Sequence, residues 1–142
     1  MTAAHNLQRF VEAQNCVYEE VLAELTAGCK QTHWMWFIFP QLAGLGSSPT
    51  ARLYALSGIA EARTYLTHAV LGPRLQECTD LANAVCGRTA LEIFGTPDHL
   101  KFRSSMTLFA RAAGGESVFR EALARYFDGE PDPMTLSLLG KE

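Results

Sequence analysis

The sequence predicts an all-α fold: a compact, single-domain bundle of about seven helices over residues 1–142. Residues that start and stop helices recur along the chain, and they frame apolar residues spaced three and four apart. Segments of alternating apolar and polar residues, typical of half-buried strands, do not stand out. The length of 142 residues, with 48% hydrophobic and 19% charged residues, is that of one folded globular domain.

The first expected helix begins near Asn6, which can cap it, and Gly28 is placed to end it. Apolar residues recur between them at helical spacing. The apolar run at residues 34–39 is compatible with either a buried helical turn or a strand. Pro40 should end this element, whether it is a helical turn or a strand.

Two short helices are expected next. Ser48 followed by Pro49 is a cap with a proline at the first helical position. Ser57 can cap a further helix that runs to about Thr67.

The C-terminal half carries five further helix signals. They predict helices from Gly72 to Gly87, from the capping box at Thr89 and Glu92, from Thr96 to Gly115, from Val118 to Phe127, and from Asp132 onward.

Charge and hydropathy exclude several classes of partner. The formal net charge is −3 and no basic stripe is present, so we expect no nucleic-acid partner. No apolar run is long enough to span a membrane, and no secretory signal is visible, so we expect a cytoplasmic protein. No feature specifies a cofactor or an oligomeric state.

The four cysteines are expected to be reduced, structurally passive thiols. None of their spacings is Cys-x-x-Cys, so neither zinc nor a redox pair is indicated. Cys16 and Cys78 are expected on apolar helix faces. No His-x-x-x-His pair occurs, and we predict no metal site.

One block, residues 30–41, holds both tryptophans between polar residues. Trp34 and Trp36 are two residues apart, so they diverge in a helix and share a face in a strand. The tryptophans either pack in the core or provide a stacking surface for a flat ligand. One tryptophan could fill the core while the other lines a pocket. His33, just before them, is either a structural hydrogen-bonding group or an acid–base residue.

Small residues follow at positions 44–49 and end at a helix N-terminus, where backbone N–H groups favour an anion. The loop matches neither the P-loop nor the dinucleotide-binding pattern, and an ordinary turn with a helix cap is the alternative.

A second polar cluster occupies residues 98–107. Helical spacing places Lys101 beside Asp98 and beside Ser104 and Ser105. The hydroxyl groups of Ser104 and Thr107 could bond back to carbonyls one turn earlier. Alternatively, Lys101 and the two serines point into a pocket. The chain has nine arginines but only three lysines, and two of those, Lys30 and Lys101, lie in or beside the two clusters.

Helix packing could bring the two clusters together as one pocket for a small anionic or nucleotide-like ligand. An enzyme acting on such a ligand, with His33 or Lys101 as acid or base, is the first alternative. A protein-interaction module that exposes the aromatic block is the second. The expected pocket consists of His33, Trp34, Trp36, Gln41, Ser47, Ser48, Lys101, Ser104 and Ser105.

Several motifs resemble the bacterial domain-of-unknown-function 1810 family over nearly the whole chain. They are Leu7-Gln8-Arg9-Phe10-Val11, the block at 30–41, the loop at 44–48, Gly72-Pro73-Arg74-Leu75, Ile93-Phe94-Gly95, Asp98 with Lys101, and residues 104–109. The resemblance implies a compact, mostly helical domain and no established activity. Members often carry the label "calpastatin", but that inhibitor is a long disordered chain and this one is compact and apolar. Phe102 and Arg103 depart from the smaller aliphatic pair expected there.

Overall fold

The computed structural model describes residues 6–141, and this part of the chain folds into ten helices with no sheet. The all-α prediction is therefore confirmed, whereas the expected number of about seven helices is too low. The helices are α1 (Gln8–Asn15), α2 (Tyr18–Ala27), α3 (Met35–Ile38), α4 (Pro49–Leu53), α5 (Ile59–Thr67), α6 (Leu71–Ala84), α7 (Ala90–Phe94), α8 (Asp98–Ala113), α9 (Val118–Phe127) and α10 (Pro133–Leu139).

The first expected helix is in fact two helices, α1 and α2. The Val17 N–H donates to the Gln14 carbonyl, which tightens the chain into a turn between them. The buried side chain of Gln14 donates to the Phe37 carbonyl and contacts the Tyr65 hydroxyl. The break lets α1 pack on α3 while α2 packs on α6. It also leaves Cys16 exposed at the turn rather than on an apolar helix face, so that expectation was wrong.

The apolar run at residues 34–39 forms the short helix α3. The Ile38 N–H donates to the Trp34 carbonyl and the Phe39 N–H to the Met35 carbonyl. The helix ends at Phe39, directly before Pro40, which has no N–H to continue it.

Most predicted caps are present. The Ser48 hydroxyl accepts from the Ala51 N–H at 3.1 Å. Thr89 and Glu92 form the capping box of α7, and Asp132 accepts from the Thr135 N–H at the start of α10. Gly28 ends α2 with a φ of 72°.

Three helix starts use another cap position than expected. The cap position of α1 is Leu7 rather than Asn6, although the Asn6 side chain accepts from the Gln8 N–H. Ser57 does not cap α5: the cap position is Gly58, which has no side-chain cap, and the Ser57 N–H donates to the Glu61 carboxylate of the first turn at 2.7 Å. Helix α8 begins at Asp98, with Pro97 rather than Thr96 at the cap position.

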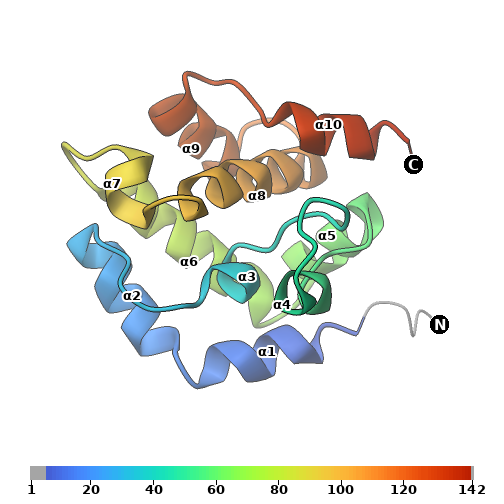
Figure 1. Ribbon diagram of the computed structural model, residues 1–142, viewed down its shortest axis with the longest axis horizontal. Helices are drawn as coiled ribbons and strands as arrows, with labels where there is room; N and C mark the ends of the chain where they lie inside the picture. Colours follow the sequence, from blue (N-terminus) through green and yellow to red (C-terminus); the bar gives the residue numbers. More distant parts are fainter. Residues whose placement is uncertain (1–5, 142) are drawn as a thin grey trace.

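Helix α8 crosses the middle of the molecule (Figure 1). In that view, α9 and α10 lie on one side of it and α1, α3 and α4 on the other. Phe102 of α8 stacks on Phe94 with ring centroids 4.5 Å apart, and Phe39 meets it edge-on at 5.0 Å. Phe102, the departure from the family pattern, thus lies at the centre of an aromatic cluster. Its neighbour Arg103 donates to the carbonyls of Glu130 and Pro131.

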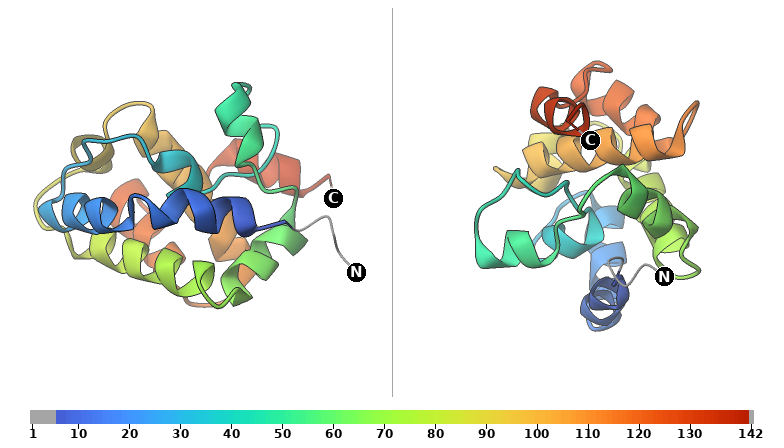
Figure 2. Two further views of the ribbon diagram at one scale, coloured as in Figure 1. Left: turned by 90° about the horizontal axis from the view of Figure 1, so that it is seen from below. Right: turned by 90° about the vertical axis from the view of Figure 1, so that its right-hand side faces the viewer.

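The segment between α3 and α5 leaves the body of the protein and returns to it. Hydrogen bonds from the Ala43 N–H to the Leu56 carbonyl and from the Leu56 N–H to the Gln41 carbonyl join its two ends. Helix α4 stands out from the rest of the fold on this segment (Figure 2), and none of its residues is buried. Within residues 6–141, no helix is both long and apolar enough to cross a membrane.

Candidate functional site

A cleft of about 400 Å³ lies where α3, the loop before α4, the first turns of α8 and the start of α10 meet. Its volume is in the range of small-molecule pockets. The lining residues are Trp36, Gln41, Leu45, Gly46, Ser47, Ser48, Ala51, Pro97, Leu100, Lys101, Ser104, Asp132 and Met134.

The two tryptophans diverge, as two residues at this spacing do at a helix. Trp34 is 1% exposed, and its indole N–H donates to the Glu24 carboxylate at 2.9 Å. Trp36 is half-buried and forms part of the cleft wall. One ring therefore belongs to the core and the other to the cleft.

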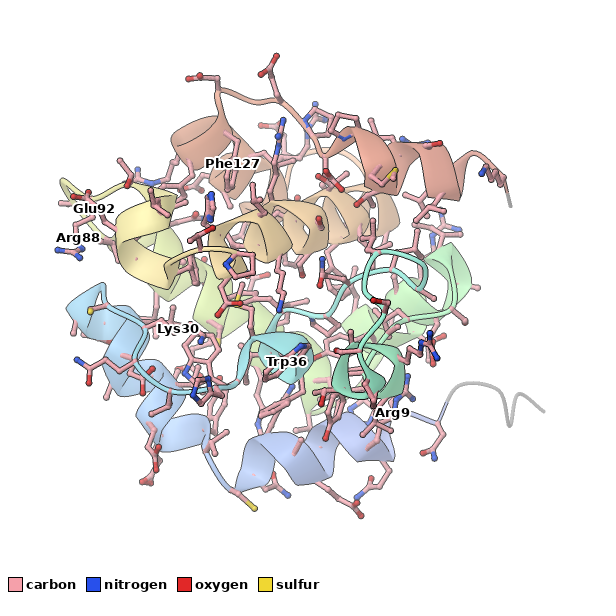
Figure 3. All side chains as sticks on the ribbon, viewed as in Figure 1. Arg9, Lys30, Trp36, Arg88, Glu92 and Phe127 are labelled. Atoms are coloured by element: carbon pink, nitrogen blue, oxygen red, sulfur yellow. The ribbon has the colours of Figure 1, made fainter. Side chains whose placement is uncertain are left out.

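Asp98 links the two lysines of the predicted clusters. Its carboxylate lies 2.8 Å from the Lys30 ammonium and 3.5 Å from the Lys101 ammonium. Lys30 also lies 5.1 Å from the centroid of the Trp34 ring, and Lys101 lies 4.9 Å from that of Trp36. Figure 3 shows Lys30 and Trp36 on the same side of α8, Lys30 in the segment that joins α2 to α3 and Trp36 in α3.

The charges of this group do not cancel, because one carboxylate serves two ammonium groups. Lys30 is nearly buried, with 7% of its side chain exposed, and its ion pair with Asp98 is the shorter one. The side chain of Lys101 is 25% exposed and lines the cleft. Lys101 therefore brings a positive charge to the cleft, and the Asp132 carboxylate in the same lining, which accepts from the Ser104 and Thr135 hydroxyls, brings a negative one.

Glu24 holds the segment that leads into α3. Its carboxylate accepts hydrogen bonds from the N–H groups of Gln31 and Thr32, the Thr32 hydroxyl and the Trp34 indole. Partial burial favours the neutral acid, but these hydrogen bonds outweigh it and lower the pKa of Glu24 to about 2. The charged carboxylate thereby holds the segment that leads into α3 and the Trp34 indole in place.

The two serines of the second cluster lie in different surroundings. The Ser104 hydroxyl is within hydrogen-bonding distance of the Leu100 carbonyl and of the Asp132 carboxylate, and Ser104 lines the cleft. Ser105 is fully buried, and its hydroxyl has no hydrogen-bond partner among the described residues. Thr107 bonds back to the Arg103 carbonyl, as its spacing suggested.

Six of the nine expected pocket residues line one cleft: Trp36, Gln41, Ser47, Ser48, Lys101 and Ser104. The other three do not. His33 is exposed outside the cleft lining, and Trp34 and Ser105 are buried. Sequence reasoning missed Asp132 and Met134, which reach the cleft only because α10 folds back onto α8.

The aromatic block does not form an exposed patch. Trp34, Met35, Ile38 and Phe39 are each at most 2% exposed. The block is therefore mainly core, with the Trp36 ring as its contribution to the cleft.

Comparisons with known proteins support the fold. The family model for proteins of unknown function, DUF1810, matches residues 4–139. A crystal structure of the conserved hypothetical protein Rv1873 from Mycobacterium tuberculosis is similar, with 55% sequence identity and a TM-score of 0.95. That match covers 96% of this chain and 98% of the mycobacterial one. The comparison with curated proteins gives no match. The chain therefore belongs to the DUF1810 family of proteins of unknown function.

Proposed function

We propose that the protein binds a small anionic, nucleotide-like ligand in the cleft between α3, the loop before α4 and α8. A single observation carries this proposal: the half-buried Trp36 ring and the Lys101 ammonium lie 4.9 Å apart in the wall of the same cleft. An aromatic face and a cation at this distance suit a ligand with both a flat ring and a negative charge.

The remaining wall residues supply polar groups for such a ligand. Gln41 contributes an amide, and Ser47 and Ser48 contribute hydroxyls on the loop opposite α8. The Ser48 hydroxyl already accepts from the Ala51 N–H, so it retains its own proton to donate. Leu45, Leu100 and Met134 add apolar surface beside these groups.

Asp98 gives Lys101 a resting partner that a ligand can replace. The Lys101 ammonium is 3.5 Å from this carboxylate, a looser contact than that of Lys30 at 2.8 Å. A bound anion would draw Lys101 toward the cleft while Lys30 continues to neutralise Asp98. The ligand therefore binds without leaving the partly buried Asp98 carboxylate unpaired.

The burial of the aromatic block favours ligand binding over a protein-interaction module, and the position of His33 limits the candidates for an enzyme. A partner patch needs exposed aromatic surface, and most of the block is core. For an enzyme, His33 lies outside the cleft lining, so Lys101 is the candidate acid or base that borders the cleft.

The proposal is tested by a thermal-shift screen of nucleotides and other anionic metabolites. We expect at least one compound to raise the melting temperature of the wild-type protein, because ligands that bind only the folded state stabilise it. The Lys101→Met variant should lose this shift while keeping most of its unliganded stability. Lys141→Met, at an exposed lysine beyond α10, is the matched control and should respond like the wild type.

A screen in which no anionic compound shifts the wild-type protein contradicts the proposal. A shift that Lys101→Met retains in full would place the binding elsewhere. If the unliganded Lys101→Met variant were strongly destabilised, Lys101 would be a structural residue instead.

A further inference from the structure

A second cleft lies at the opposite end of α8 from the first. Its volume is about 500 Å³, and α8, the loop before α9, α9 and the segment before α10 enclose it. The lining residues are Thr107, Ala110, Arg111, Gly114, Gly115, Arg120, Leu123, Gly129, Pro131 and Leu136.

Two arginines from different helices line this cleft. Arg111 comes from the last turn of α8 and Arg120 from α9, and both are exposed. The Arg120 guanidinium donates to the Gly115 carbonyl at 3.4 Å, which holds it against the cleft wall. A neighbouring hollow of about 200 Å³ brings Arg63 of α5 beside Arg111.

These positive charges are not neutralised within residues 6–141. The ion pairs of this part of the chain involve Arg9, Lys30 and Lys101, and the cleft lining contains no acidic residue. Glu116 and Glu121 line an adjoining hollow that shares Arg120, Leu123 and Gly129 with this cleft, but neither lies within ion-pairing distance of Arg120. In a chain of net charge −3, this is a local excess of positive charge at a concave surface.

The rest of the wall is apolar or bare backbone. Ala110, Leu123 and Leu136 form its apolar part. A Cβ atom built on Gly114, Gly115 or Gly129 would meet nothing within 4 Å, so open space adjoins the backbone there. The Thr107 hydroxyl is occupied, since it donates to the Arg103 carbonyl and accepts from the Asp132 N–H.

We infer that this second cleft is a binding site for an oxyanion, phosphate or carboxylate, carried on a small apolar body. The two guanidinium groups supply planar donors that match the oxygens of such a group. The apolar wall accommodates the body to which the oxyanion is attached. The inference uses none of the residues of the proposed nucleotide-like site and does not depend on it.

The test is a titration of the uniformly ¹⁵N-labelled protein with phenyl phosphate, followed by amide signals. We expect saturating shifts at Ala110, Gly114, Gly115 and Gly129 at millimolar concentration. Benzyl alcohol, with a similar ring and no charge, should not shift them. Arg111→Gln and Arg120→Gln should each weaken binding about tenfold, because each removes a charge-assisted hydrogen-bond donor.

Two control variants keep this test specific. Arg125→Gln removes another exposed arginine of α9 that also donates to a backbone carbonyl, and it should bind phenyl phosphate like the wild type. Lys101→Met, in the first cleft, should also leave this binding unchanged. Shifts that do not saturate, or equal binding by Arg111→Gln and the wild type, would overturn the assignment. So would an equal loss in Arg125→Gln, because that indicates nonspecific attraction to arginines.

Discussion

At the scale of single residues, Glu24 organises more of the candidate site than any sequence pattern indicated. Its carboxylate receives four hydrogen bonds from residues 31–34, the stretch that leads into α3. This anchor satisfies the indole N–H of Trp34 in the core, two residues before the cleft-lining Trp36. A glutamate on α2 thus acts on a cleft that it does not line.

The contribution of Glu24 to stability should depend on pH. Its folded-state pKa of about 2 lies below the ordinary value of 4.5, so the charged form stabilises the fold above pH 4.5. This contribution is lost as the pH falls from 4.5 toward 2, because the carboxylate is protonated. In urea unfolding followed by tryptophan fluorescence, Glu24→Gln should be less stable than the wild type near neutral pH. The difference should shrink over that acidic range.

Glu12→Gln is the control for this prediction, since Glu12 is exposed on α1 and no side-chain hydrogen bond holds it. Its free energy of unfolding should follow that of the wild type at every pH. A difference between Glu24→Gln and the wild type that stays constant down to pH 2 would contradict the assigned role.

Individual site residues were predictable where local spacing determines direction. The two-residue spacing of Trp34 and Trp36 indicated that one ring could fill the core and the other line a pocket. The i, i+3 spacing of Asp98 and Lys101 likewise predicted their contact. The burial of Ser105 was not predictable. The packing of partner helices decides which of two neighbouring residues on α8 is buried and which lines the cleft.

At the scale of elements, helix ends are set by residues with a clear conformational reason. Gly28 ends α2 with a φ of 72°, which L side chains adopt only at a cost. A Cβ atom there would lie 3.0 Å from a Val85 methyl group, close to the end of α6. Gly28 therefore both ends α2 and allows α2 to approach α6.

Two alanine variants separate these effects. Gly87→Ala has a similar φ of 75° with open space around its Cβ, so it should cost only the backbone strain of about 1–2 kcal/mol. Gly28→Ala should cost more, because Val85 must also move. Chemical denaturation of both variants measures the difference. Equal free energies of unfolding would show that the approach to Val85 has no energetic weight.

The elements themselves were largely predictable from capping residues. Ser48, Thr89 and Asp132 act as caps because their short polar side chains bond N–H groups of the first turn. The turn at Val17 was not predictable, because it satisfies contacts of α1 with α3 and of α2 with α6. No residue near Val17 indicates a break in the helix. The apolar residues continue at helical spacing on both sides of the turn, so the sequence predicts one long helix.

At the scale of the whole molecule, the first cleft depends on segments far apart in the sequence. Trp36, Lys101 and Asp132 come from α3, α8 and the start of α10. Pairing of the first two could be predicted from their polar clusters. The contribution of α10 could not, because it rests on hydrogen bonds from the Ser104 hydroxyl to the Asp132 carboxylate and from the Asp132 N–H to the Thr107 hydroxyl, which only the folded chain brings together.

The reactivity of each cysteine thiol should depend on how deeply the fold buries it. All four are free thiols in the structure; Cys16 and Cys86 are exposed, and Cys78 is buried. Burial raises the pKa of Cys78 to about 12, so its reactive thiolate is scarce at neutral pH. In the native protein, a thiol reagent should modify Cys16 and Cys86 first and Cys78 last. After denaturation without reductant it should count four thiols; a lower count would indicate a disulfide.

The nucleotide-like site is tested most directly by the two tryptophan indole N–H signals of the ¹⁵N-labelled protein, during titration with the strongest compound from the thermal-shift screen. The Trp36 indole lines the cleft, whereas the Trp34 indole is bound to Glu24 in the core and serves as an internal control. We expect the Trp36 signal to shift and saturate while the Trp34 signal stays nearly constant, and we expect Lys101→Met to abolish the shift. Saturable binding that leaves the Trp36 signal unmoved would contradict the proposed site.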